Sequence, residues 1–295
     1  MPTDAVLREL LVRHLETWLP GALHRARRAT LALAYAGGDA GCAEAALRVV
    51  AGHADRLRGR QLTVLVLADG TEELPARLGA VEAELPASVA VHLVPGGPAR
   101  LPVAVKAAGA AGAPLLSVVD AAADPAVLTA AAAGKPADVL LAPAPGATAR
   151  AALADAGFPL TTEVEVVPAD GAPARLFAFA TGSDKSLEAF KEALWAVGEA
   201  VGGRYRDPAG GLLDVVGAPE PGPLRREFLA ELARSGPRTV TELRRHALTA
   251  TAYRSSDAVR ALTGLLDAGE AARDPEHGRL GGDVVISARD TGPAA

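Results

Sequence analysis

The sequence has very few of the residues that build disulfide scaffolds and metal centres. Its 295 residues include one cysteine, Cys42, so no internal disulfide can form. The six histidines are scattered, with no spacing that would gather three ligands around zinc. We therefore expect neither a disulfide framework nor a simple metal site.

A long apolar run is also lacking. No segment approaches the roughly 18 consecutive apolar residues of a membrane span, and the N-terminal MPTDAVLREL carries Asp4 and Glu9 in place of a signal-peptide core. With 49% hydrophobic and 22% charged residues, the composition is that of a soluble globular protein. We expect a cytoplasmic protein without a membrane partner.

Strong charge of either sign is missing as well. The net formal charge is -5, and residues 223–295 carry 11 basic and 10 acidic side chains. A net charge near zero in this segment is well below the strongly positive charge of a domain that binds nucleic acid on its own. Any such contact would depend on a local patch.

What the chain does contain is a regular alternation of apolar runs with amphipathic stretches. Strands are predicted at 30–36, 62–68, 89–94, 115–120 and 137–143, with helices near 43–57, 73–85, 98–111, 124–133 and 147–156. Fully apolar strands separated by helices indicate a parallel sheet that is covered on both faces. A helix over 4–19, with leucines at helical spacing, is expected to pack on this sheet.

The parallel strands are followed by an expected antiparallel pair. Residues 161–167 alternate polar with apolar, and 174–181 follow after a short loop. A helix over 183–201 comes next, with Ser183 as its N-cap. Five parallel strands closed by an antiparallel pair form the Rossmann-like α/β arrangement of the class I methyltransferase sheet.

The last third of the chain reads as a separate unit. Residues 203–222 are dense in glycine and proline, which predicts a linker between an α/β domain at 1–202 and a second domain at 223–295. That second domain shows three helical patterns followed by two strands around a glycine-containing turn. This order is typical of a winged helix.

Three sequence features converge on the carboxyl ends of the predicted parallel strands. AGGDAG follows the first strand, Asp69 ends the second, and Asp120 ends the fourth. Glycines there let the backbone approach a ligand, and a carboxylate after the second strand can accept the ribose hydroxyl protons of an adenosine group. Taken singly, each feature is better explained as a tight turn or a helix cap, whereas the three together favour descent from a cofactor site.

Several segments resemble one known family. ARLFAFATGSDKSLEAFKEALWAVG (174–198) has a strand ending in Ala-Thr, a turn containing lysine, and a helix carrying Leu194 and Trp195. The N-terminal helix ending at Trp18 and the stretch 251–270 match in character. The chain resembles the three-Cys-motif partner proteins (TcmP). That resemblance implies a class I methyltransferase domain followed by a winged helix, S-adenosylmethionine as cofactor, and a radical-type three-Cys-motif protein as partner.

The chain departs from the family pattern where the chemistry would occur. After the first strand, family members carry a sequence similar to Asp-Gly-Phe-Ala-Gly-Pro-Gly. In this chain Tyr35 stands in place of the leading acid, and Asp39 is the one nearby residue that could replace that acid. After the fourth strand the family resembles Ile-Asp-Pro-Phe-Gly, and this chain keeps only Asp120 before the alanines 121–123. Carried over by the resemblance, Asp120 is the catalytic candidate, and the cofactor-binding candidates are Tyr35, Gly37, Gly38, Asp39, Gly41 and Asp69. The losses predict an eroded site whose cofactor binding is weakened or lost.

The predicted winged helix supplies candidates for nucleic-acid contact. In such modules the third helix enters the major groove and the wing touches the backbone. The candidates are Arg254, Ser255, Ser256 and Arg260 on the helix, with Arg273 and Arg279 at the wing. Four acids interleave with them and oppose a polyanion, namely Asp257, Asp267, Asp274 and Glu276. A protein-interaction or packing module is the favoured alternative.

Two interpretations of function stay open at this point. In the first, the chain is a TcmP-like protein whose methyltransferase-like domain has become a binding or regulatory scaffold for a partner protein. In the second, it remains an S-adenosylmethionine-dependent methyltransferase that acts on nucleic acid or protein. The replaced motif residues favour the first.

Overall fold

A computed structural model describes residues 3–35, 41–69, 74–144, 146–169, 171, 173–208 and 210–289. The N-terminal part contains α1 (Thr3–Arg25), β1 (Arg28–Tyr35), α2 (Gly41–Gly52), η1 (Ala54–Leu57), β2 (Gln61–Ala68), α3 (Leu74–Glu82), β3 (Val89–Pro95), η2 (Pro98–Arg100), α4 (Leu101–Ala107), β4 (Leu115–Asp120), α5 (Pro125–Ala131), β5 (Ala137–Leu141), α6 (Arg150–Asp155), β6 (Leu160–Val167), β7 (Arg175–Thr181) and α7 (Asp184–Val201). The remainder contains β8 (Arg204–Arg206), β9 (Leu212–Asp214), α8 (Gly222–Ser235), β10 (Arg238–Thr239), α9 (Val240–Ala250), α10 (Ser255–Asp267), β11 (Ala271–Asp274) and β12 (Val285–Ala288).

The strand order of the main sheet confirms the predicted fold class. Its nine strands run β3-β2-β1-β4-β5-β7-β6-β8-β9. The pairings among β1 to β5 are parallel, and β7 runs antiparallel between β5 and β6. The strand order reverses between β1 and β4, which is the switch point where doubly wound sheets bind ligands. The domain is therefore a Rossmann-like α/β fold of the class I methyltransferase arrangement.

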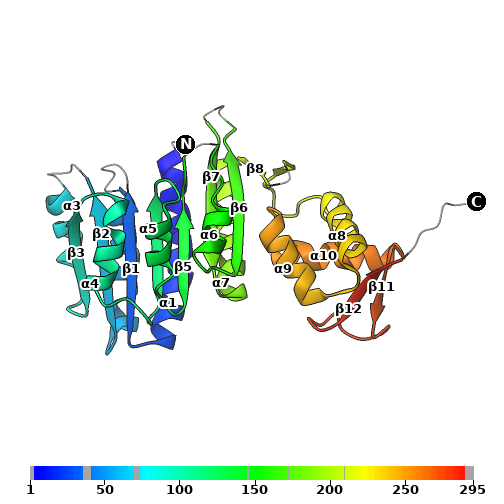
Figure 1. The fold of residues 1–295 in the computed structure, drawn as a ribbon, viewed down its shortest axis with the longest axis horizontal. Coiled ribbons are helices and arrows are strands. Elements are labelled where there is room, and N and C mark those ends of the chain that lie inside the picture. Colours follow the sequence, from blue (N-terminus) through cyan, green and yellow to red (C-terminus); the bar gives the residue numbers. More distant parts are fainter. Residues whose placement is uncertain are drawn as a thin grey trace, which may run out of the picture.

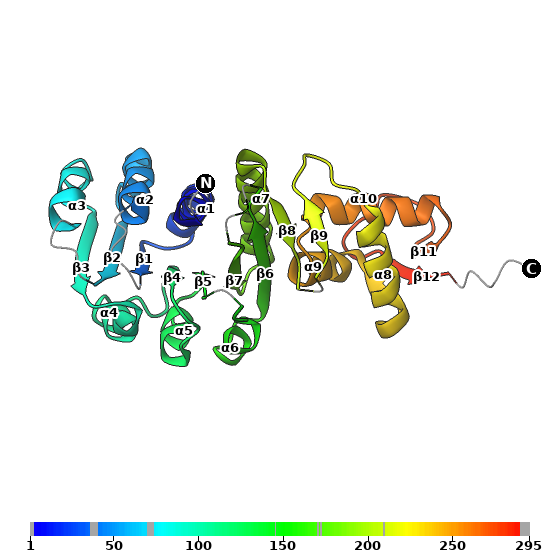
Figure 2. The same cartoon turned by 90° about the horizontal axis from the view of Figure 1, so that it is seen from above.

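Helices cover both faces of this sheet, as the apolar strands require. Figure 2 shows α1, α2, α3 and α7 on one face and α4, α5 and α6 on the other. Each face has its own hydrophobic cluster, and β1 is buried from its second residue to its last. Strand β3 at the sheet edge is only partly covered and carries the exposed His92. The strands are apolar along their whole length because helices cover both faces of the sheet.

Two helices on the first face bear on the sequence predictions. Helix α7 begins after Ser183, whose Oγ accepts a hydrogen bond from the Ser186 amide at 3.3 Å, so the predicted N-cap is confirmed. Helix α1 runs past the predicted end at residue 19 and past Pro20 to Arg25. The buried Ala22 and Leu23 continue the apolar stripe and explain the extra turn.

Part of the stretch predicted as a linker belongs to the sheet. Strands β8 and β9 form a small hairpin that pairs with the end of β6. Tyr205 in β8 is fully buried, and its hydroxyl donates a hydrogen bond to the carbonyl of Leu194. The glycines and prolines therefore mark the turns around this hairpin rather than an unstructured connection.

The C-terminal unit has a small core of its own. Helices α8, α9 and α10 pack on a three-stranded antiparallel sheet of order β10-β12-β11 (Figure 1). Buried residues such as Phe228, Leu243, Leu262 and Ile286 form its core. The three predicted helices and the terminal hairpin are present, while the two-residue β10 was not predicted. The winged-helix interpretation of this unit stays a prediction.

Figure 1 shows the C-terminal unit beside β6, and α9 connects this unit to the α/β domain through contacts with that strand and with α7. Leu248 and Ala252 of this unit join the main hydrophobic cluster of the α/β domain. In the described ranges, no helix combines the length and apolar content that crossing a bilayer requires.

Candidate functional site

The ends of β1 and β2 come together beside Gly97 in the turn after β3. A Cβ built on Gly97 would lie 3.0 Å from Asp69 Oδ2 and 3.6 Å from the carbonyl oxygen of Tyr35. The turn can approach both groups this closely because residue 97 has no side chain. Asp69 itself is exposed. The ends of these two strands therefore lie side by side at the carboxyl edge, while most of the glycine loop that was predicted to meet Asp69 lies outside the described residues.

The loop between β1 and α2 is described only at its ends. Gly41 starts α2, and Tyr35 ends β1 with its side chain buried. The predicted cofactor-binding residues Gly37, Gly38 and Asp39 lie outside the described residues. Their role as a ligand loop stays a prediction.

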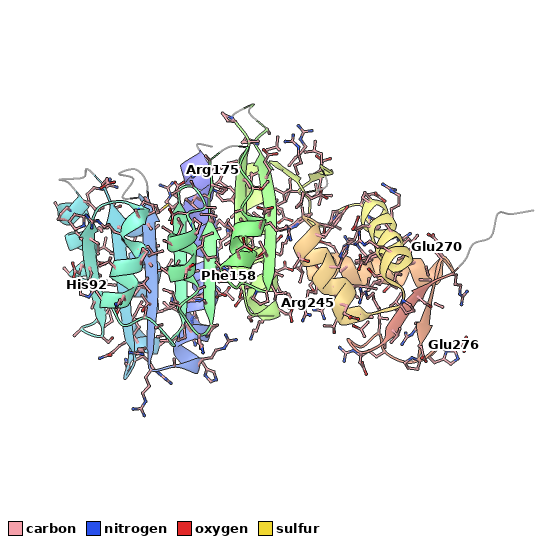
Figure 3. The ribbon with its side chains drawn as sticks, viewed as in Figure 1. His92, Phe158, Arg175, Arg245, Glu270 and Glu276 are labelled. Carbon is pink, nitrogen blue, oxygen red and sulfur yellow. The ribbon has the colours of Figure 1, made fainter. Side chains whose placement is uncertain are left out.

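Asp120 ends β4 next to Tyr35 in the register of the sheet. Its Oδ1 accepts a hydrogen bond from Nη2 of Arg175, the first residue of β7, so the two form an ion pair. Figure 3 places Arg175 at the upper edge of the sheet. Its guanidinium also lies 5.8 Å from the ring centroid of Phe177. The acid retained from the family motif is thus already paired within the chain.

Sequence reasoning missed Arg175, although a signal was present. An antiparallel strand starts at the edge where its parallel neighbours end, so the first side chain of β7 is brought to the carboxyl ends of β4 and β5. Beyond Asp120, the side chains of Ala121 and Ala123 pack against the second hydrophobic cluster of the sheet. The turn after β4 therefore contributes packing and no aromatic wall.

These residues fit one end of an adenosyl cofactor. An exposed carboxylate such as that of Asp69 is of the chemical type that accepts ribose hydroxyl protons, and Gly97 leaves the space that a Cβ would fill. Asp120 fits less well, because Arg175 already neutralises it. The edge thus resembles a ribose site more than a complete catalytic centre.

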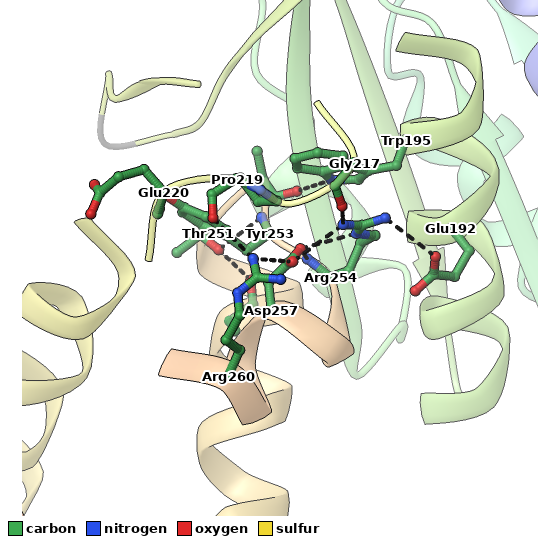
Figure 4. A network of polar contacts seen from close by, with 12 residues as sticks. Glu192, Trp195, Gly217, Pro219, Glu220, Thr251, Tyr253, Arg254, Asp257 and Arg260 are labelled. Carbon is green, nitrogen blue, oxygen red and sulfur yellow. Dashed lines mark hydrogen bonds and ion pairs between the residues drawn. The ribbon is translucent and has the colours of Figure 1, made fainter. Parts of the chain in front are cut away.

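The first candidate residue for nucleic-acid contact is held at the junction between α7 and α10. The Arg254 guanidinium carbon lies 4.2 Å from the ring centroid of Trp195 (Figure 4). Its Nε donates to Asp257 Oδ2 at 3.0 Å, and its Nη2 donates to the Gly217 carbonyl at 2.8 Å. The Arg254 side chain is 14% exposed. The positive charge of Arg254 therefore interacts mainly with groups of this chain.

The other candidates in this unit differ in their surroundings. Arg260 Nη2 lies 2.9 Å both from Asp257 Oδ1 and from the Pro219 carbonyl, and Ser255 Oγ accepts a hydrogen bond from Arg244 Nε at 2.8 Å. The Arg273 guanidinium donates to three carbonyls of its own hairpin, those of residues 275, 278 and 279. Ser256 and Arg279 are exposed. Nucleic-acid binding by this unit stays a prediction.

A second set of donors ties α7 to the chain beyond α9. Lys191 Nζ donates to the Thr251 carbonyl at 2.6 Å, and Trp195 Nε1 donates to the Ala252 carbonyl at 3.0 Å. Lys191 is fully buried. Burial, with a smaller contribution from Arg150, lowers the pKa of the Lys191 amine to about 7, although Asp207 opposes the shift.

No family model and no curated protein matches the chain. One of the solved structures that it resembles is a candidate S-adenosylmethionine-dependent methyltransferase from Streptococcus mutans, at 14% identity and a TM-score of 0.36. The likeness covers 57% of this chain and 48% of that one, so the chain spans about half of that protein's length. The fold assignment rests on the strand order and not on this weak likeness.

Proposed function

We propose that this chain is a TcmP-like protein whose methyltransferase-like domain serves as a binding or regulatory scaffold for a partner protein. The observation that carries this proposal is the ion pair between Asp120 and Arg175 at the carboxyl edge. In this pair Arg175 binds the carboxylate that, in a methyltransferase of this family, would face the substrate. A three-Cys-motif protein is the partner class that the family resemblance implies.

The alanines after β4 support the same conclusion. Catalysis of group transfer depends largely on holding the acceptor in line with the donor. The small side chains of Ala121 and Ala123 are partly buried against the second hydrophobic cluster and offer no aromatic surface for this purpose. Releasing Asp120 for catalysis would also leave the half-buried Arg175 without this partner, which is energetically unfavourable.

The alternative, an active S-adenosylmethionine-dependent methyltransferase acting on nucleic acid or protein, is favoured by one specific observation. Asp69 and the carbonyl of Tyr35 meet beside Gly97, as a ribose site would require. Methyl transfer needs alignment more than proton transfer, so a missing histidine or cysteine does not argue against it.

The C-terminal unit enters the proposal as a protein-interaction module. The charges at the start of α10 are engaged with α7 and with the chain around residues 217–219. Because these arginines are bonded within the chain, the unit is better suited to present a rigid surface to a partner protein than to bind the phosphates of a nucleic acid. Nucleic-acid contact through Arg279 and the wing is the competing proposal.

Isothermal calorimetry with S-adenosylmethionine and S-adenosylhomocysteine tests the proposal. A scaffold without a working cofactor site gives no heat at millimolar ligand, and that result defeats the enzyme alternative. Micromolar binding that disappears in Asp69→Ala defeats the scaffold proposal. Asp55→Ala is the matched control, because Asp55 is an exposed acid in η1, paired with Arg58 at a distance from this edge.

A further inference from the structure

A cavity of about 370 Å³ lies at the edge of the sheet opposite to Asp69 and Asp120. Its walls come from the second half of α1, the first turns of α7 and the start of β5. Asp138, the second residue of β5, pairs in register with Thr181, the last residue of β7, which places both at the amino ends of the parallel strands. The volume falls in the usual range for small-molecule pockets.

The floor of this cavity carries a carboxyl that is incompletely hydrogen-bonded. Asp138 is 1% exposed, and its Oδ1 accepts a hydrogen bond from the Thr181 hydroxyl. Oδ2 has no partner in hydrogen-bonding geometry among the described residues, although Ser186 and Trp18 lie near the carboxyl. Burial raises the pKa of Asp138, while Thr181, Ser186, Arg25 and Trp18 oppose the shift.

A histidine lines the same cavity in a similar state. His14 is 2% exposed and packs edge-on against Phe179 and Phe190, at centroid distances of 4.9 and 5.9 Å. Burial lowers the pKa of His14 to about 4, so the ring is neutral at pH 7 and offers one donor and one acceptor. Within the described part of the chain, neither ring nitrogen has a hydrogen-bond partner.

Unpaired polar groups at this depth are uncommon and call for an explanation. Folded proteins pair nearly all buried polar side-chain atoms with protein, water or ligand. Here Asp138 and His14 come from different elements and face one cavity, so their unmet hydrogen bonds share a location. A molecule in the cavity that both donates and accepts would satisfy them.

The remaining lining indicates the other properties of such a molecule. The exposed cationic side chains of Arg25, Arg56 and Lys185 line the cavity. The amino terminus of α7 adds the positive end of a helix dipole. Apolar walls come from Trp18, Pro20, Ala22, Pro136 and Ala189. The charge favours an anion, and the walls favour a flat apolar body.

We propose that this cavity binds a small organic anion with an apolar, ring-like body and a hydroxyl group at the end away from its negative charge. The anionic group faces Arg25, Arg56 and Lys185, and the hydroxyl reaches Asp138 and His14. This site is independent of the proposed function, because none of its residues lies at the carboxyl edge.

The probes are 4-hydroxybenzoate and benzoate, which differ only in the hydroxyl. Calorimetric titration of the full chain should show 4-hydroxybenzoate binding about tenfold tighter than benzoate, because only the former satisfies the buried polar groups. Arg25→Ala and Lys185→Ala should each weaken 4-hydroxybenzoate binding several-fold. Arg27→Ala is the matched control, since Arg27 is an exposed arginine near Arg25 that does not line the cavity.

The nuclear magnetic resonance signals of individual histidines show where the ligand binds. The histidine ring signals of His14 should shift on addition of 4-hydroxybenzoate, while those of His92, at the far edge of the sheet, should not. Three results would overturn the proposal: no binding of either probe at millimolar concentration, equal affinity for both, or binding that survives the Arg25 and Lys185 variants but is lost in Asp69→Ala. In the first case ordered water would satisfy the buried groups.

Discussion

At the residue scale, two side chains of α7 complete the end of α9. The last carbonyls of a helix have no partners within it and must find donors elsewhere. Just beyond the end of α9, the carbonyls of Thr251 and Ala252 receive hydrogen bonds from Lys191 and Trp195, which are four residues apart and share one face of α7. The bond from Lys191 to the C-cap Thr251 therefore serves the end of α9, and both bonds serve the junction with α7.

Lys191 makes the stability of the protein depend on pH. Its pKa falls from 10.5 when unfolded to about 7 when folded, so between these values the unfolded chain binds more protons. The cost of burying the charged amine is complete below pH 7 and disappears as the pH rises towards 10.5. We expect the free energy of unfolding to rise by roughly 2 kcal/mol between pH 7 and pH 9.

The variant Lys191→Met keeps the packing of the stem and removes the titrating amine. Urea denaturation of the wild type and the variant at both pH values measures the difference, since groups common to both proteins cancel. The variant should lose most of the rise. Equal slopes in the two proteins would show that the amine does not titrate in this range.

At the element scale, α7 and α10 are joined through Arg254, which a buried carboxylate of α10 holds in place. The Asp257 side chain is 1% exposed and accepts hydrogen bonds from Arg254 and from Arg260. Arg254 in turn stacks on Trp195 of α7. The start of α10 is thereby fixed against the α/β domain.

Removing Arg254 should therefore cost far more than removing an exposed arginine. In Arg254→Ala the buried Asp257 loses its main partner and the Trp195 ring loses its cation, which we expect to destabilise the fold by about 3 kcal/mol. Arg245→Ala breaks the exposed pair with Asp184 and should cost less than about 1 kcal/mol. Chemical denaturation compares the two, and similar small losses would contradict a buried junction.

The elements that were predictable from sequence are those defined by local pattern. Apolar runs such as residues 115–120 coincide with β4, and Ser183 caps α7 as its side-chain type indicates. Strands β8 and β9 were missed because each has three residues, too few to show a period. The pair between Asp120 and Arg175 was missed because it joins residues 55 positions apart. The contact of Arg254 with Trp195 was not predicted for the same reason, since the ring lies on another helix.

At the scale of the whole molecule, the core of the C-terminal unit is in contact with the main cluster of the α/β domain. Leu213 of β9 packs against both the main cluster and that of the C-terminal unit, and Leu248 and Ala252 belong to the main cluster. Together with the hydrogen bonds to Thr251 and Ala252, this continuity favours one body with a fixed outer surface. Such a surface suits a partner protein that contacts both parts at once.

The same continuity bears on nucleic-acid binding, because a third helix can enter a major groove only with its first residues exposed. Here the start of α10 packs towards α7, and the Arg273 guanidinium is turned onto its own hairpin. We expect fluorescence anisotropy with a DNA duplex to show no salt-dependent binding by the wild type. Electrostatic binding would weaken steeply as salt rises from about 50 to about 200 mM. A salt-dependent affinity that falls in Arg279→Ala but not in Arg27→Ala would contradict this expectation and assign the hairpin to a phosphate backbone.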